Sequence, residues 1–218
     1  MKRLIIANIL ALICLNASAQ YCDWAKFDRY SQANAQVEGR PLAVFMGDSI
    51  TDNWFSFDGE FFTANNLAGR GISGQTTSQM LVRFRKDVID LHPKYVVILA
   101  GTNDIAKNNG EISLENILGN IQSMCELARL HKIKPILCSV LPADRYEWRK
   151  DVKPAAEIVR LNQMLQAYAK AQKIPYVDYH SALKDDNDGL PSKFASDGVH
   201  PNVDCYKIME EIVLRYLK

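Results

Sequence analysis

Short apolar runs alternate with longer amphipathic segments from residue 41 to the end of the chain, and this alternation restricts the fold. Four runs are clear, 42-LAVFM-46, 95-YVVILA-100, 135-PILCSVL-141 and 175-PYVDY-179, and a weaker one lies near 65-NNLAG-69. Runs this apolar are typical of strands that are buried on both faces, as parallel strands are. We therefore expect about five strands in one mainly parallel sheet.

The segments between these runs carry apolar residues at helical spacing. They predict amphipathic helices at Thr76–Leu91, Leu114–Leu130, Ala155 to about Ala171, and about Val203–Leu217. Strands that alternate with helices in this way form a doubly wound α/β sheet, a three-layer α/β/α sandwich. In such sheets the functional residues collect in the loops at the carboxyl ends of the strands.

The N-terminus has the order of a secretory signal peptide. Lys2 and Arg3 precede the apolar run Leu4–Leu15, and Ala17-Ser18-Ala19 supplies small residues for cleavage. A buried strand or helix is the alternative, but a membrane anchor would need roughly 20 apolar residues. Cys22 does not follow small residues directly, so lipid attachment is not indicated. We expect a signal peptide at 1–19 and an exported protein, periplasmic or extracellular.

Residues 20–218 are enough for one domain with a substantial core, and no linker or repeat marks a second. The net charge of +1, without a basic run, argues against a nucleic-acid partner. After cleavage the cysteines are Cys22, Cys125, Cys138 and Cys205, whose spacing excludes a C-x-x-C motif. Disulfides and buried thiols both stay open, as does the oligomeric state.

Four polar groups stand where the loops of the predicted sheet should meet. They are 47-GDS-49, 71-GISG-74, 101-GTND-104 and 196-SDGVHPN-202. A serine hydroxyl becomes a nucleophile when a histidine takes its proton and a third group orients the histidine. Of the four histidines, only His200 has an acid in a tight turn beside it, Asp197. These residues predict Ser49 as nucleophile, His200 as base and Asp197 as its orienting acid.

Ester hydrolysis also needs fixed donors for the negative charge that forms on the carbonyl oxygen. The candidates are the backbone N–H groups of Ser49 and Gly74 and the side-chain amide of Asn103. Each residue has a simpler interpretation alone, since Asp48-Ser49 and Asn103-Asp104 could cap helices and the other groups could be turns. Four groups in the right order favour the catalytic interpretation.

On these four blocks the sequence resembles the GDSL/SGNH superfamily of serine hydrolases, over residues 42 to 202. The resemblance implies a flavodoxin-like fold, the same catalytic and oxyanion residues, and no metal or organic cofactor. The segments GISGQTT and GTND are similar to platelet-activating-factor acetylhydrolase-like and carbohydrate acetylesterase-like members, which favour short acyl groups. Gln75 departs from the Asp of many relatives. The α/β-hydrolase pattern G-x-S-x-G fails at Thr51.

Aromatic residues near the predicted site are candidates for substrate contact. Trp54, Tyr146 and Trp148 could stack on a sugar or pack around an acyl chain, or they could be core or lid residues. The expected function is an exported serine esterase that removes short acyl groups, above all acetyl, from a carbohydrate or similar alcohol.

Three alternatives accompany that expectation. A lysophospholipase or thioesterase would use the same machinery, although no membrane-binding amphipathic helix is evident. A metal-dependent phosphoesterase would need several histidine and carboxylate ligands, and only one histidine has a suitable context. A non-catalytic glycan-binding relative would keep the fold without turnover.

Overall fold

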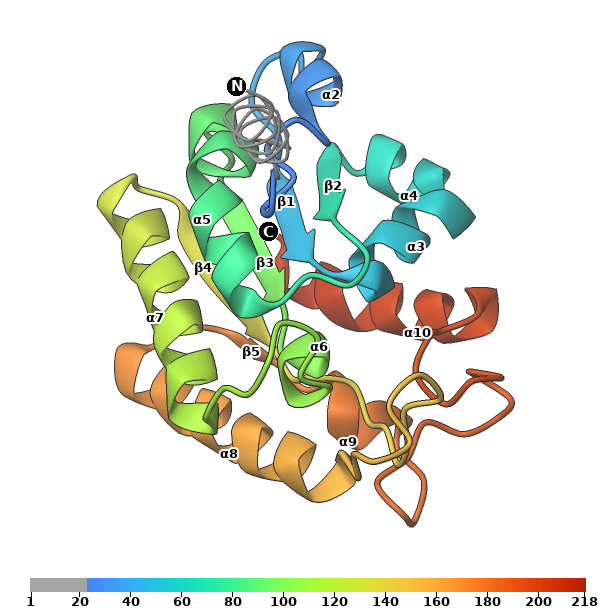
Figure 1. Cartoon of the computed structure of the whole chain (residues 1–218). Helices are drawn as coiled ribbons and strands as arrows, with labels where there is room; N and C mark the ends of the chain where they lie inside the picture. Colours follow the sequence, from blue (N-terminus) through green and yellow to red (C-terminus); the bar gives the residue numbers. More distant parts are fainter. Residues whose placement is uncertain (1–22) are drawn as a thin grey trace, which may run out of the picture.

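The computed structural model describes residues 23–218, and its centre is a five-stranded parallel sheet (Figure 1). In spatial order the strands are β2 (Leu67–Gly71), β1 (Ala43–Gly47), β3 (Tyr95–Leu99), β4 (Lys134–Cys138) and β5 (Tyr176–Val177). All neighbouring pairs are parallel. The strand order reverses between β1 and β3, so the loops after these strands diverge. A crevice for ligands therefore opens at the carboxyl edge of the sheet.

Each of the five apolar runs overlaps one strand, so the prediction of a parallel five-stranded sheet is confirmed. The run at 135–141 is longer than its strand, because β4 ends at Cys138. Beyond that point Asn162 takes the place of a neighbouring strand. Its Oδ1 accepts from the backbone N–H of Val140 at 2.8 Å, and its Nδ2 donates to the Val140 carbonyl at 3.0 Å.

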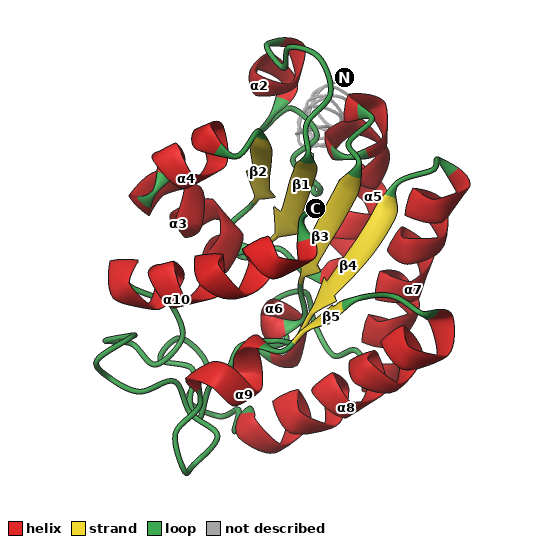
Figure 2. Cartoon of the chain, turned by 180° about the vertical axis from the view of Figure 1, so that it is seen from behind, coloured by secondary structure: helices red, strands yellow, loops and turns green. Residues whose placement is uncertain are grey.

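Helices cover both faces of the sheet, as the view from behind shows (Figure 2). One face packs against α5 (Thr77–Asp87), α7 (Leu114–Leu130) and α8 (Ala155–Gln172). The other face packs against α3 (Ser49–Phe57), α4 (Gly59–Ala64), α9 (Tyr179–Leu183) and α10 (Val203–Val213). The predicted three-layer α/β/α sandwich is therefore confirmed.

The four long helices lie where the periodicity predicts them, and two are shorter than expected. The segments 76–91 and 203–217 each end in a 3₁₀ turn, Ile89–Leu91 after α5 and Leu214–Tyr216 after α10. The apolar spacing does not predict the short helices α2 (Ser31–Ala35), α4, α6 (Thr102–Ile105) and α9. Of these, α6 follows β3 and contributes to the site.

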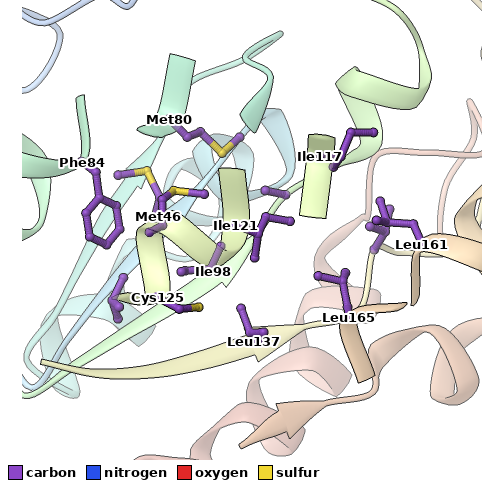
Figure 3. Close-up of a cluster of buried hydrophobic side chains, with 14 of the residues drawn as sticks. Met46, Met80, Phe84, Ile98, Ile117, Ile121, Cys125, Leu137, Leu161 and Leu165 are labelled. Atoms are coloured by element: carbon purple, nitrogen blue, oxygen red, sulfur yellow. The ribbon is translucent and has the colours of Figure 1, made fainter. Parts of the chain in front are cut away.

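Alternate residues of the strands divide between the two cores. Val44 and Met46 of β1 pack with α5, α7 and α8, in the cluster that Figure 3 shows around Met46, Met80 and Ile121. Ala43 and Phe45 point to the opposite face. Because both faces are buried, the strands read as continuous apolar runs instead of alternating ones.

The second core is aromatic and fixes α3 against the sheet. The Phe45 ring meets Trp54 edge to face, with 5.5 Å between ring centroids. Trp54 in turn stacks between Phe61 and Tyr206, at 5.5 and 5.3 Å. Since α3 begins at Ser49 and carries Trp54, this packing also holds the position of Ser49.

The predicted signal peptide at 1–19 and Cys22 lie outside the described residues. Within 23–218, Cys125, Cys138 and Cys205 are free and buried thiols. Burial raises the pKa of Cys125 and of Cys205 to about 12, which keeps them protonated and unreactive at neutral pH. No helix in this part of the chain combines the length and the apolar content needed to cross a bilayer.

Candidate active site

The loops at the carboxyl edge of the sheet form a pocket of about 290 Å³. In Figure 1 this edge is where β1 leads into α3 and β3 leads into α6. We call it the Ser49 pocket, and its lining residues are Ser49, Asn53, Ser73, Gly74, Asn103, Asn108, Trp148 and His200. Five of the eight are residues that the sequence singles out. Ser73 belongs to the 71-GISG-74 block but had no predicted role, and Asn53 and Asn108 were not singled out.

Ser49 and His200 are in hydrogen-bond contact although 151 positions separate them in the chain. The Ser49 Oγ lies 2.9 Å from His200 Nε2, and His200 Nδ1 lies 2.6 Å from Asp197 Oδ2. The order serine, imidazole, carboxylate is the arrangement that activates a serine hydroxyl. None of the other three histidines lines this pocket.

The environment of Asp197 determines which ring nitrogen of His200 carries the proton. Burial of the carboxyl would raise its pKa, but hydrogen bonds from His200 and the backbone outweigh this and hold the pKa of Asp197 below its ordinary value. Its Oδ1 accepts from the N–H groups of Val199 and His200, both at 2.9 Å. An ionised carboxylate only accepts, so Nδ1 of His200 must donate to it. The Nε2 of the neutral ring is therefore free to accept from Ser49.

Asp48, not Ser49, caps the helix that begins at the pocket. The Asp48 side chain accepts from the backbone N–H of Ile50 at 3.0 Å, and Ser49 is the first residue of α3. Burial raises the pKa of Asp48 to about 6. A backbone N–H in the first helical turn has no carbonyl partner within its own helix, so that of Ser49 can serve as a donor to a ligand.

Gly74 and Asn103 also line the Ser49 pocket. Gly74 has a φ of +82°, in the left-handed region that favours glycine, and a Cβ there would meet no protein atom within 4 Å. The Asn103 side chain is buried, and its Nδ2 donates one hydrogen to the Gln75 carbonyl at 3.1 Å. An amide nitrogen carries a second hydrogen, which this arrangement leaves for the pocket.

Asn108 fixes the orientation of the Asn103 amide. Its Nδ2 donates to Asn103 Oδ1 at 2.8 Å and to the Gly74 carbonyl at 3.3 Å, and its Oδ1 accepts from the Trp148 indole N–H at 3.2 Å. Asn103 thus meets a donor at its oxygen and an acceptor at its nitrogen. This pairing allows only the orientation that presents the amide nitrogen to the pocket. The only sequence signal for Asn108 is its place five residues after Asn103.

A completely buried arginine ties the ends of β1 and β2 together beneath the pocket. Arg83 Nη2 donates to the carbonyls of Gly47 and Arg70 at 3.1 and 2.9 Å, and Nη1 pairs with Asp87 at 2.9 Å. Its Nε donates to Gln75 Oε1 at 2.6 Å. Gln75 is therefore a hydrogen-bond partner of the Arg83 guanidinium.

Asp104, the last residue of the 101-GTND-104 block, ties α6 to α5. Its two carboxyl oxygens accept from the backbone N–H of Thr77 at 3.1 and 2.9 Å, and Oδ1 also accepts from the Thr77 hydroxyl at 2.6 Å. Burial raises the pKa of Asp104 to about 6. A carboxylate at a helix N-terminus is stabilised by the helix dipole. This contact and the bond from Asn103 to Gln75 hold the two loops in register.

Comparison with known proteins places these residues in a family. The family model described as GDSL-like Lipase/Acylhydrolase matches residues 45–208, which include all four sequence blocks. The chain belongs to this GDSL-like acylhydrolase family. Its expected membership in the GDSL/SGNH superfamily is thereby confirmed.

Solved and curated acylhydrolase relatives agree with this. A GDSL-like lipase from Bacteroides thetaiotaomicron is 45% identical, covers 89% of this chain and 98% of its own, and superposes with a TM-score of 0.86. The isoamyl acetate-hydrolyzing esterase of Saccharomyces cerevisiae is 23% identical over 203 residues, 80% of this chain and 85% of the yeast protein.

Two further curated relatives match only part of their own length. The acetylxylan esterase of Xylanibacter ruminicola is 27% identical over 153 residues, 61% of this chain and 30% of that protein. An uncharacterized lipoprotein of Bacillus subtilis is 39% identical over 80 residues, 35% of this chain and 33% of that protein. The chain therefore spans about a third of each of these two relatives.

Two of the three aromatic residues considered for substrate contact lie outside the pocket of this acylhydrolase. Trp54 is 1% exposed, and its indole N–H donates to Glu210 at 3.1 Å within the aromatic core. Tyr146 is fully buried beneath Trp148, with 4.9 Å between the ring centroids, and its hydroxyl donates to the Thr102 carbonyl. Both side chains are therefore core residues, which is the alternative interpretation given above.

Trp148 differs from the other two aromatic residues. It is 41% exposed and lines the Ser49 pocket, and its ring centroid lies 6.0 Å from that of His200.

The described residues hold no group of three or more His, Cys, Asp or Glu side chains placed to bind one metal ion.

Proposed function

We propose that this acylhydrolase is a serine esterase that removes short acyl groups, most of all acetyl, through an acyl-enzyme on Ser49. The observation that carries the proposal is the continuous contact from Ser49 Oγ to His200 Nε2 at 2.9 Å and from His200 Nδ1 to Asp197 Oδ2 at 2.6 Å. Ser49 lies in a pocket with Gly74 and Asn103, which supply donors for the oxyanion of ester hydrolysis.

The mechanism follows from the protonation states. His200 Nε2 takes the Ser49 proton as Oγ attacks the ester carbonyl carbon, and Asp197 stabilises the imidazolium that forms. The carbonyl oxygen becomes an oxyanion, which accepts from the backbone N–H groups of Ser49 and Gly74 and from Asn103 Nδ2. Collapse breaks the bond to the alcohol oxygen, and the proton on His200 leaves with the alcohol.

Deacylation repeats these steps with water. His200 takes a proton from a water molecule, the water oxygen attacks the acyl carbon on Ser49, and the carboxylic acid leaves as Ser49 recovers its proton from His200. Each step uses only side chains and backbone groups of the Ser49 pocket and of Asp197. No metal or organic cofactor takes part in the proposed reaction.

The short acyl group is supported by size and by the relatives. The Ser49 pocket, at about 290 Å³, is slightly smaller than the usual range for ligand sites, roughly 300–1,000 Å³. The yeast relative and the acetylxylan esterase are both named for acetyl esters, of a small alcohol and of a polysaccharide. We extend the acetyl group to this chain, and we favour a carbohydrate alcohol.

Export belongs to the same proposal. Lys2 and Arg3, the apolar run Leu4–Leu15 and Ala17-Ser18-Ala19 support a signal peptide at 1–19, cleaved before Gln20. Residues 20–218 would then act as one domain in the periplasm or outside the cell. N-terminal sequencing of the protein recovered from its producing cells tests the cleavage site directly.

Asn108 should act on the reaction through Asn103. We expect Asn108→Ala to lower kcat roughly tenfold with little change in KM, because the Asn103 amide loses the donor that fixes it. In an Asn103→Ala background the same change should cost almost nothing further. Steady-state kinetics of the two single variants and the double variant measure this coupling.

Asn109→Ala is the matched control for Asn108. Asn109 is also exposed, but its amide binds Thr76 and Gln79 of the α5 N-terminus instead of Asn103. Its kcat should stay close to that of the unmodified enzyme. Equal losses at 108 and 109, or additive losses of Asn103→Ala and Asn108→Ala, would show that Asn108 supports the loop only generally.

A substrate series tests the proposed function itself. We expect kcat/KM for 4-nitrophenyl esters to fall at least about tenfold between acetate and octanoate, since roughly 1.4 kcal/mol of acyl misfit suffices. Activity should persist in EDTA. Faster hydrolysis of lysophospholipids would favour the lysophospholipase alternative. Loss of activity in EDTA would favour the metal-dependent phosphoesterase. Binding of glycans without turnover of any ester would favour the non-catalytic glycan-binding relative.

A further inference from the structure

A second hollow, of about 370 Å³, adjoins the Ser49 pocket. We call it the Phe57 hollow, and its lining residues are Asn53, Phe57, Ser192, Ser196, Asp197, His200, Pro201 and Asn202. It shares Asn53 and His200 with the Ser49 pocket but includes neither Gly74 nor Asn103. The two hollows therefore meet at the imidazole and extend from it on different sides.

The geometry of the reaction determines which part of the ester lies toward each hollow. In the proposed mechanism the carbonyl oxygen points to Gly74 and Asn103, while the alcohol oxygen must lie near His200 Nε2 to receive its proton. The alcohol portion of an ester bound at Ser49 therefore extends along the His200 side. The Phe57 hollow is the space on that side.

Helix α3 connects the nucleophile with this hollow. Ser49, Asn53 and Phe57 follow each other at four-residue intervals, so they lie along one face of the helix. Phe57 ends that row and is 56% exposed, with only a tilted contact to the Tyr206 ring at 6.1 Å. An aromatic ring exposed at the end of a row that starts at the nucleophile is available for a substrate.

The chemistry of the lining indicates what kind of alcohol fits. Two serine hydroxyls and the Asn53 amide lie beside one aromatic face, a combination that matches the hydroxyl groups and the C–H face of a sugar ring. The Asn202 amide, also in the lining, already binds the Cys205 N–H and the Lys193 carbonyl. The charged groups in the lining are the catalytic ones, Asp197 and His200, and it contains no lysine or arginine. Phosphate-bearing alcohols, such as those of lysophospholipids, would find no cation there.

Two cations on neighbouring segments, Arg145 and Lys207, could in principle serve a phosphate-bearing alcohol, but both are paired. Arg145 lies against Gly198, but Asp144 and Glu147 pair with its guanidinium at 3.0 and 3.1 Å. Lys207 of α10 is likewise paired, with Asp58 and Glu210. Arg145 and Lys207 are thus already paired with carboxylates. Lys193, next to the lining residue Ser192, instead has its ammonium over the Phe194 ring, 4.7 Å from the ring centroid, and does not line the hollow.

We propose that the Phe57 hollow is the alcohol subsite of this esterase, and that it takes a neutral polyhydroxylated ring stacked on Phe57. The proposal rests on the proposed esterase function and adds the class of its leaving alcohol. It assigns Phe57 to alcohol recognition, with Asn53, Ser192 and Ser196 as hydrogen-bonding partners of the ring hydroxyls.

The test compares one acyl group on two alcohols. We would measure kcat/KM for an acetylated methyl xyloside and for methyl acetate, whose alcohol is too small to reach Phe57. Phe57→Ala should lower the ratio of the two values roughly tenfold, mostly through KM of the xyloside. Phe55→Ala is the matched control, since Phe55 is a 48% exposed aromatic residue of the same helix that packs on Phe62 and does not line the hollow.

The possible outcomes distinguish failure of the proposed alcohol subsite from failure of the proposed esterase function. A ratio unchanged in Phe57→Ala, or lowered equally in Phe55→Ala, would overturn the subsite while the esterase remains. Higher kcat/KM for a lysophospholipid than for the acetylated xyloside would also overturn it. If the unmodified protein hydrolyses neither acetate ester, the proposed esterase function itself has failed.

Discussion

Replacement of Ser49 by alanine is expected to lower kcat for acetyl esters by about 10⁴-fold or more, the loss typical of a missing serine nucleophile. The reason is geometric: the Ser49 Oγ is the atom of the pocket that contacts the Nε2 base at 2.9 Å. The fold should not change, because Ser49 caps nothing and Asp48 keeps its contact with the Ile50 N–H. Initial rates with 4-nitrophenyl acetate and a thermal unfolding curve measure both effects.

Ser56→Ala controls for serine removal in the same helix. Ser56 is exposed on α3, and its hydroxyl donates only to the Asp52 carbonyl at 3.1 Å, so kcat should stay within about twofold of the unmodified enzyme. The double variant Ser49→Ala/His200→Ala should be no slower than Ser49→Ala, since the two residues act as a unit. Normal turnover by Ser49→Ala would contradict the proposed mechanism.

Asp197→Asn should lower kcat by roughly 10³- to 10⁴-fold without loss of the fold. An asparagine amide can donate to His200 Nδ1, where the carboxylate only accepts at 2.6 Å. The ring would then carry its proton on Nε2, facing Ser49, and could no longer accept the serine proton. Steady-state kinetics give the loss, and the proton resonance of the Nδ1 hydrogen bond in the NMR spectrum should disappear with it.

Asp204→Asn is the control for removal of a nearby negative charge. Asp204 is exposed in the first turn of α10, and its substitution should change kcat little. A small effect at Asp197, no larger than that at Asp204, would mean that the carboxylate does not set the tautomer of His200. The assignment of the base would then have to change.

The sheet and its long helices could be predicted because burial on two faces and helical periodicity are local properties of the sequence. The end of β4 could not, because Asn162, 22 residues after Val140, occupies the backbone groups that would have continued the strand. The short α6 also has no periodic signal, since its four residues form barely one turn.

The site could be predicted where topology alone brings residues together. The loops that hold Ser49, Gly74 and Asn103 follow neighbouring parallel strands, so they had to meet at one edge. Asn108 could not be predicted, because its effect depends on how the loop after α6 folds back onto Asn103. Residue type alone also made Trp54 and Tyr146 candidates for substrate contact, although both are buried in the core.

Helix α3 illustrates that last point. A tryptophan near the nucleophile looked like a substrate contact, yet Trp54 shares a face of α3 with Ile50 and is buried with it. Phe57 shares the other face with Ser49 and is exposed. Helical phase would have separated the two, because positions 49, 53 and 57 lie on one face of a helix and positions 50 and 54 on another.

The most direct test of the central claim, hydrolysis through an acyl-enzyme on Ser49, is covalent trapping with a fluorophosphonate. Mass spectrometry of the digested protein should find the phosphonyl adduct on Ser49 alone, with one adduct per molecule and activity lost in proportion. His200→Ala should label far more slowly, because the hydroxyl lacks its base. An enzyme that stays fully active while Ser49 carries the adduct, or that loses activity with the adduct on another residue, would contradict the account.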